Sequence, residues 1–159
     1  MTERKLTEAE MMMEVAWAES EKSECLKKKV GAILTVRPKD DMGLIILGYG
    51  YGGWIHKCET CVRKIHEWQQ DGCWSIHSEV RAIFNALEAC GYRTFEKGLM
   101  FTTAGPCDQC LKYMAFFKIP RVIYSVPYHN DYTKWNGIIE VCRLNEDGSI
   151  SLENAPLGG

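Results

Sequence analysis

Apolar positions recur along the chain with two different spacings, and the spacing separates helices from strands. Thr7 and Glu10 form a capping-box pattern at the start of residues 8–22, where apolar side chains follow at helical intervals. The runs 30–36 and 43–50 are continuously apolar and flank the turn-forming residues of a hairpin. We therefore expect a first helix followed by two antiparallel strands that are covered on both faces.

Helices and strands alternate in the rest of the chain. The predicted elements are, in order, a helix at 76–91, a strand at 97–105, a helix at 106–119, a strand at 121–126, a helix at 131–144 and a strand at 149–154. A hairpin followed by this alternation is typical of an α/β fold with a mixed sheet and helices on its faces. No repeat or linker interrupts the pattern, so residues 1–159 are predicted to form a single domain.

Residues 51–76 interrupt this rhythm. The segment is rich in Cys, His and Trp, and no helical or strand period holds across it. A loop of this length inside a domain is normally functional or fixed by something other than regular structure. A bound zinc ion would fix it.

The composition narrows the class of partner. The 159 residues have a formal net charge of −2, without the basic excess that proteins use to bind long nucleic acid. The charged start of the chain lacks the apolar stretch of a signal peptide, and no apolar run is long enough to span a bilayer. We expect a cytoplasmic protein that acts on a small molecule and does not associate with a membrane.

Eight cysteines are many for a chain in a reducing compartment, where structural disulfides are disfavoured. Clustered cysteines then indicate metal binding, and isolated ones indicate burial. Cys90 and Cys142 lie in apolar patterns and are expected in the core.

The sequence PCDQC is the strongest candidate for a metal site. Cys107 and Cys110 lie three residues apart at the start of a predicted helix, where the backbone N–H groups favour thiolates. His77 begins the preceding predicted helix, at the same end of the sheet. Three protein ligands leave a fourth zinc position for water, which is the catalytic rather than the structural arrangement.

Glu79 lies two residues beyond His77, close enough to reach that water without binding the metal. The pattern H-x-E followed by P-C-x-x-C is the signature of zinc deaminases, in which the glutamate is the general acid and base. Two other hypotheses are a purely structural zinc site, with Glu79 exposed on a helix, and a thiol–disulfide exchanger built on Cys-x-x-Cys pairs.

The stretches KKKVGAILTV, GYGYGG, HSEVRAI, FTTAGPCDQC and RVIYSVPYHND follow the order found in one enzyme family. Over roughly residues 8–140 the chain resembles the cytidine/deoxycytidylate deaminase superfamily, most of all its dCMP deaminase branch. The resemblance implies a three-layer α/β/α fold with a five-stranded sheet, and hydrolysis of dCMP to dUMP and ammonia. It also implies a homo-oligomer, since these enzymes commonly form hexamers.

Three positions depart from the pattern of that branch. It usually has alanine at the position of Ser78, asparagine at the position of Arg81 and a pocket asparagine at the position that matches Gly50. Pocket polar groups decide substrate choice by large factors. The deamination chemistry is therefore better supported than the substrate. A modified or different nucleotide or nucleobase, a base in nucleic acid, and a non-catalytic zinc-binding relative stay open.

Further candidates surround the expected pocket. Lys27, Lys29 and Arg63 are phosphate-contact candidates, with an ordinary surface position as the alternative for each. Arg81 is a candidate for a phosphate or a base carbonyl, with a charge on the helix surface as the alternative. The aromatic candidates are Trp74 and Tyr128, for which a place in the core is the alternative; Trp54 and Trp68 lie in the same long loop as Trp74.

The sequence HKCETC supplies Cys58 and Cys61, which form a second Cys-x-x-Cys pair. Some relatives place a structural zinc in the segment before the H-x-E motif. The predicted ligands are Cys25, Cys58, Cys61 and Cys73, with His66 as the main substitute and His56 as a weaker one. The alternative is that these cysteines are free and reduced.

Overall fold

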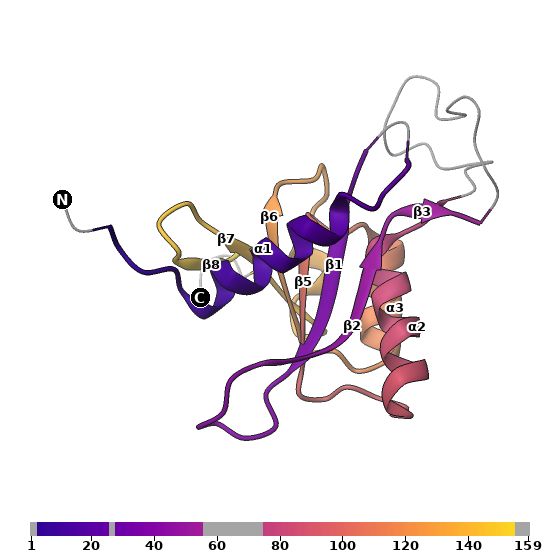
Figure 1. Cartoon of the computed structure of the whole chain (residues 1–159), viewed down its shortest axis with the longest axis horizontal. Helices are drawn as coiled ribbons and strands as arrows, with labels where there is room; N and C mark the ends of the chain where they lie inside the picture. The colour runs from indigo at the N-terminus through magenta and orange to yellow at the C-terminus, as the bar shows by residue number, and fades with distance from the viewer. Residues whose placement is uncertain (1–2, 26–27, 56–74, 155–159) are drawn as a thin grey trace.

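The computed structural model describes residues 3–25, 28–55 and 75–154 (Figure 1). The first helix, α1, spans Glu8–Ser20 and has the predicted capping box. The Glu10 backbone N–H donates to Thr7 Oγ1 at 3.2 Å, and the Thr7 N–H donates to the Glu10 carboxylate at 2.9 Å. These two bonds satisfy N–H groups that the first helical turn leaves without a partner.

A six-stranded mixed sheet forms the centre of the fold, one strand more than expected. Its strands, in spatial order, are β2 (Ile45–Tyr51), β1 (Gly31–Val36), β5 (Gly98–Ala104), β6 (Arg121–Val126), β7 (Glu140–Leu144) and β8 (Ile150–Leu152). The pairs β1–β2, β1–β5 and β7–β8 are antiparallel, whereas β5–β6 and β6–β7 are parallel. Ile45 and Tyr49 of β2 are exposed, so the prediction that this strand is covered on both faces was wrong.

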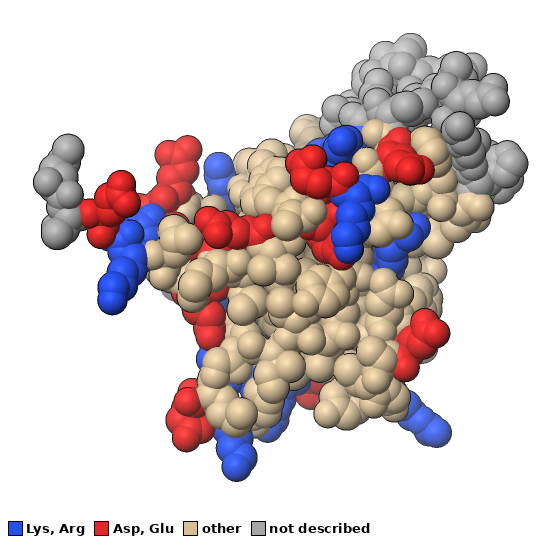
Figure 2. All heavy atoms as spheres, in the orientation of Figure 1, with Lys and Arg blue, Asp and Glu red and all other residues tan. Residues whose placement is uncertain are grey.

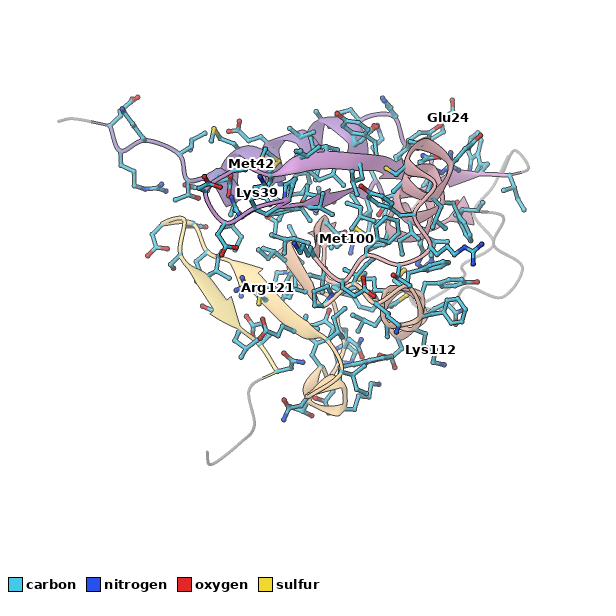
Figure 3. The ribbon with its side chains drawn as sticks, turned by 90° about the horizontal axis from the view of Figure 1, so that it is seen from below. Glu24, Lys39, Met42, Met100, Lys112 and Arg121 are labelled. Carbon is cyan, nitrogen blue, oxygen red and sulfur yellow. The ribbon has the colours of Figure 1, made fainter. Side chains whose placement is uncertain are left out.

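Helices cover both faces of the sheet, which confirms the predicted three-layer fold (Figure 1). The helices α2 (Ser78–Cys90) and α3 (Asp108–Phe116) pack on one face, and α1 packs on the other. Side chains alternate along β1, so Leu34 packs under α2 and α3 whereas Ile33 packs under α1. Met100 of β5 lies in the interior on the side of α2 and α3 (Figure 3).

The predicted helix at 131–144 was wrong. One short 3₁₀ turn, η1 (Thr133–Trp135), is followed by strand β7. Gly137 has a φ of 79°, which ends any helical course, and Val141 and Cys142 are buried as strand residues in the sheet. The burial of Cys142 was predicted, but Cys90 is only half-buried.

Two short strands lie at the ends of the irregular segment. Strands β3 (Gly53–Trp54) and β4 (Ser75–Ile76) pair in antiparallel fashion, with Gly53 opposite Ile76. This pairing leads the chain directly into α2. Within the described ranges, no helix has both the length and the apolarity required to cross a membrane.

Close packing of α2 on β2 depends on Gly50. A Cβ atom there would lie 2.1 Å from the carbonyl oxygen of Ser78 and 2.5 Å from the nitrogen of Ala82. We expect Gly50→Ala to lower the free energy of unfolding by about 3 kcal/mol, because the helix must move away from the sheet. Urea unfolding measures this change.

The matched control is Gly43→Ala in the β1–β2 connection. A Cβ at Gly43 would have its nearest neighbour, Glu8 Oε2, at 3.7 Å. Its effect is expected to stay within about 0.5 kcal/mol. Equal effects of the two substitutions on the free energy of unfolding would show that the packing of α2 on β2 does not require glycine at position 50.

Candidate functional site

Three metal-binding side chains meet where α2 and α3 begin. His77 is the N-cap residue of α2, Cys107 is the N-cap residue of α3, and Cys110 lies in the first turn of α3. The Nδ1 atom of His77 lies 3.2 Å from Cys110 Sγ and 3.5 Å from Cys107 Sγ. The two sulfur atoms lie 3.6 Å apart. The helix starts thus bring together the three residues predicted as ligands.

These distances fit a tetrahedral zinc ion. Bonds of about 2.3 Å to sulfur and about 2.0 Å to nitrogen place two sulfurs about 3.8 Å apart and a nitrogen about 3.6 Å from each sulfur. The observed separations lie close to these values without any movement of the backbone. One imidazole and two thiolates are also a donor set that zinc prefers.

The two thiols have opposite pKa shifts. The hydrogen bond with Cys110, followed by that with His77, lowers the pKa of the Cys107 thiol to about 4 although burial opposes the shift. The hydrogen bond with Cys107 and burial raise the pKa of Cys110 well above its usual range. A metal that binds both sulfurs must therefore displace the proton of Cys110.

Glu79 lies in the first turn of α2, buried at 4% exposure beside the three ligands. Its Oε2 atom lies 3.4 Å from Cys110 Sγ and 3.1 Å from Ser78 Oγ. Its Oε1 atom accepts a hydrogen bond of 3.0 Å from Thr102 Oγ1 on β5. The carboxylate is thus directed toward the candidate metal centre rather than toward solvent.

A cleft of about 600 Å³, partly open to solvent, leads from the surface to these residues. His77, Glu79 and Cys107 lie on its wall. Lys28 and Tyr128 also line it, with the Lys28 ammonium 5.5 Å from the centre of the Tyr128 ring. The cleft combines a cation, an aromatic ring and a candidate metal centre.

Lys28 was not among the predicted phosphate contacts, because the sequence of three consecutive lysines does not indicate which side chain faces the cleft. The structure places Lys28 on the cleft and leaves Lys29 exposed. Lys27 lies outside the described residues, as do Arg63, Trp68 and Trp74. Tyr128 lines the cleft, which is one of the two positions predicted for it. Trp54 is half-buried in β3.

Two of the predicted pocket residues are not on the described wall of the cleft. Gly50 packs against α2, whereas Gly52 lines the cleft, and a pocket role for Gly50 stays a prediction. Arg81 is absent from the described wall of the cleft. Its guanidinium donates to the carbonyl of Gly53 at 3.1 Å and stacks 4.4 Å above the ring of Tyr51, which fixes the β2–β3 connection. Ser78 lines the cleft beside Glu79.

The second predicted metal site falls mostly outside the described residues. Cys58, Cys61, Cys73, His56 and His66 all lie there. Cys25 is described, and it is half-buried on the wall of the cleft. The four-thiolate site stays a prediction.

Asp108 connects the start of α3 to the segment after β6, a contact that no sequence pattern indicated. Its Oδ1 atom accepts hydrogen bonds of 3.0 Å from Asn130 Nδ2 and from Trp135 Nε1, and its Oδ2 lies 2.5 Å from Lys134 Nζ. Partial burial would raise the pKa of Asp108, but these hydrogen bonds lower it. Asp108 thereby holds the helix turn that carries both cysteines.

Comparison with known proteins assigns this geometry to a family. The model of the cytidine and deoxycytidylate deaminase zinc-binding region matches residues 6–126. The deoxycytidylate deaminase of Mycobacterium phage D29 is 28% identical over 127 residues, which cover 72% of this chain and 91% of the relative. That of Enterobacteria phage T2 is 25% identical, covering 93% of this chain and 92% of the relative.

A solved structure has the same fold. The dCMP deaminase of cyanophage S-TIM5, in complex with dCMP and dUMP, superposes with a TM-score of 0.66 at 24% identity. The match covers 89% of this chain and 99% of that chain. The two sheets and their helices therefore share one topology.

Proposed function

Since the chain belongs to the cytidine and deoxycytidylate deaminase family, we propose that it hydrolyses the exocyclic amine of a free nucleotide, dCMP in the first instance. The reaction consumes one water and releases dUMP and ammonia. The observation that carries this proposal is the approach of the Glu79 carboxylate to Cys110 Sγ within a zinc-type ligand set, at the wall of a cleft. The names of the phage relatives support dCMP as the first substrate to test.

His77, Cys107 and Cys110 would hold a zinc ion, which would act as a Lewis acid and bring the pKa of a bound water toward neutrality. Glu79 takes the proton of the attacking water onto its carboxylate and then delivers it to the departing nitrogen. Its burial keeps bulk water away from this transfer. The general-base and general-acid steps therefore use one side chain.

Lys28 and Tyr128 are proposed to hold the rest of the nucleotide. An ammonium group and an aromatic ring next to each other suit a phosphate and the face of a base or sugar. Val30 and Ile76 add apolar wall to the same cleft. This arrangement favours one compact anionic nucleotide, because the charges on the face seen in Figure 2 are of both signs and form no continuous basic strip.

Other features of the proposal rest on the resemblance. A second, structural zinc would bind Cys25, Cys58, Cys61 and Cys73, with His66 as a substitute ligand. Assembly into a homo-oligomer such as a hexamer, and a cytoplasmic location, are further expectations.

The deciding experiment measures ammonia release by zinc-loaded protein from cytosine and purine nucleobases, nucleosides and nucleotides. We expect turnover of dCMP or of a close derivative, and two zinc ions per chain by elemental analysis. Absence of release from every free compound would refute the proposal. Release confined to oligonucleotides would assign the chemistry to a base in nucleic acid instead.

A further inference from the structure

Both oxygens of the Glu79 carboxylate are contacted by hydroxyl groups from two different elements. Thr102 on β5 donates to Oε1 at 3.0 Å, and Ser78 on α2 donates to Oε2 at 3.1 Å. Both hydroxyl-bearing residues are buried, with exposures of 0% for Thr102 and 1% for Ser78. Neither residue is a proposed metal ligand or proton carrier.

We propose that Ser78 and Thr102 are positioning residues that fix the plane of the Glu79 carboxylate for proton transfer. The terminal torsion of a glutamate is broad and roughly two-fold, so a single hydrogen bond leaves the carboxylate able to rock about its axis. Two donors on opposite oxygens remove that freedom. The inference rests on the proposed function, since it assigns these residues to the same reaction.

The two donors are not equivalent. Thr102 Oγ1 also lies 3.2 Å from the carbonyl oxygen of Ala104, and its single hydrogen is shared between that oxygen and Glu79. Ser78 is adjacent to Glu79 in the chain, and its hydroxyl donates to Oε2, the carboxylate oxygen that lies toward Cys110. Ser78 therefore supplies a separate donor to the second oxygen of the carboxylate, which Thr102 does not reach.

The kinetic test compares Ser78→Ala, Thr102→Val and Thr102→Ser with the wild-type protein. Ser78→Ala and Thr102→Val are each expected to lower kcat about tenfold, since each loses a hydrogen bond to a charged group, with KM changed less than about twofold. Thr102→Ser keeps the hydroxyl and is expected to restore most of kcat. Zinc content should stay at the wild-type value in all three.

The matched control is Thr35→Val on the neighbouring strand β1. Thr35 is also fully buried, and its hydroxyl donates to the carbonyl of Leu99 at 2.8 Å without touching Glu79. Its substitution should change stability but not kcat. An equal fall of kcat in Thr35→Val, or no recovery in Thr102→Ser, would show that these hydroxyls matter only for folding and would overturn the inference.

Crystal structures of the zinc-loaded wild type and of the Ser78→Ala/Thr102→Val double variant give a readout that does not depend on turnover. We expect one Glu79 side-chain conformer in the wild type, and several conformers or a rotated carboxylate in the double variant. An unchanged carboxylate in the double variant would overturn the inference. Failure of the wild type to deaminate any compound would refute the proposed function, while the crystal structures would still decide whether the two hydroxyls orient Glu79.

Discussion

Substitution of Glu79 by glutamine is expected to lower kcat for dCMP at least about a thousandfold while leaving zinc bound. Glutamine has nearly the shape of glutamate. Its one carbonyl oxygen can accept a hydrogen bond from either Thr102 or Ser78, and the other hydroxyl can rotate to accept from the amide N–H, so the surrounding geometry should persist. Its amide cannot take a proton from water and return it to the departing nitrogen. Steady-state kinetics, zinc per chain and thermal unfolding of the purified variant measure these effects together.

The control for this substitution is Glu88→Gln, which makes the same chemical change on the exposed surface of α2. It should leave kcat, KM and zinc content unchanged. If Glu79→Gln retained turnover within tenfold of the wild type at full zinc content, Glu79 would not be the acid and base, and the mechanism would be wrong.

Local signals were enough to predict both helices of the candidate site. Helix α2 ends at Gly91, which has a φ of 70° at the C-cap as its position in the sequence predicted. The start of α3 was predicted to follow Pro106, and Cys107 is indeed its N-cap residue. Because His77 and Cys107 are defined by where their helices begin, the motif already placed them at one end of the sheet.

The contacts that the sequence alone could not predict are those made with distant segments of the chain. Gly50 lies within β2 against α2, whereas Gly52 lies just beyond the end of that strand, so which of the two borders the cleft depends on where β2 ends and how it packs on α2. Arg81 binds the β2–β3 connection, which lies far from it along the chain. Asp108 meets Trp135 only after the chain has crossed β6.

The wrong helix at 131–144 has a different cause. Apolar residues in this segment fit a helical and a strand pattern about equally, which is a known ambiguity of short apolar runs. The sheet decides between them, because β7 gains a parallel partner in β6 and an antiparallel partner in β8. Burial of Val141 and Cys142 between these strands outweighs local helix propensity.

Cys110→Ser is the second substitution with a large expected effect, because it removes one ligand of the candidate metal centre. A serine hydroxyl is a much poorer zinc ligand than a thiolate, so the remaining His77 and Cys107 should not retain the ion. We expect a loss of one zinc ion per chain relative to the wild type and a loss of dCMP turnover to background. The difference in zinc per chain between variant and wild type reports on this centre alone, whereas the total would include any second zinc.

The control must distinguish metal loss from damage to the core, because Cys110 is only 1% exposed. Cys142→Ser places the same hydroxyl at another buried cysteine, on β7, that is not part of the ligand cluster. Both substitutions bury a hydroxyl and should lower the free energy of unfolding by about 1–3 kcal/mol. Only Cys110→Ser should release zinc, since only its sulfur lies within 3.2 Å of His77 Nδ1. An unchanged zinc content in Cys110→Ser would mean that the ion is held elsewhere, and the active-site assignment would fall with it.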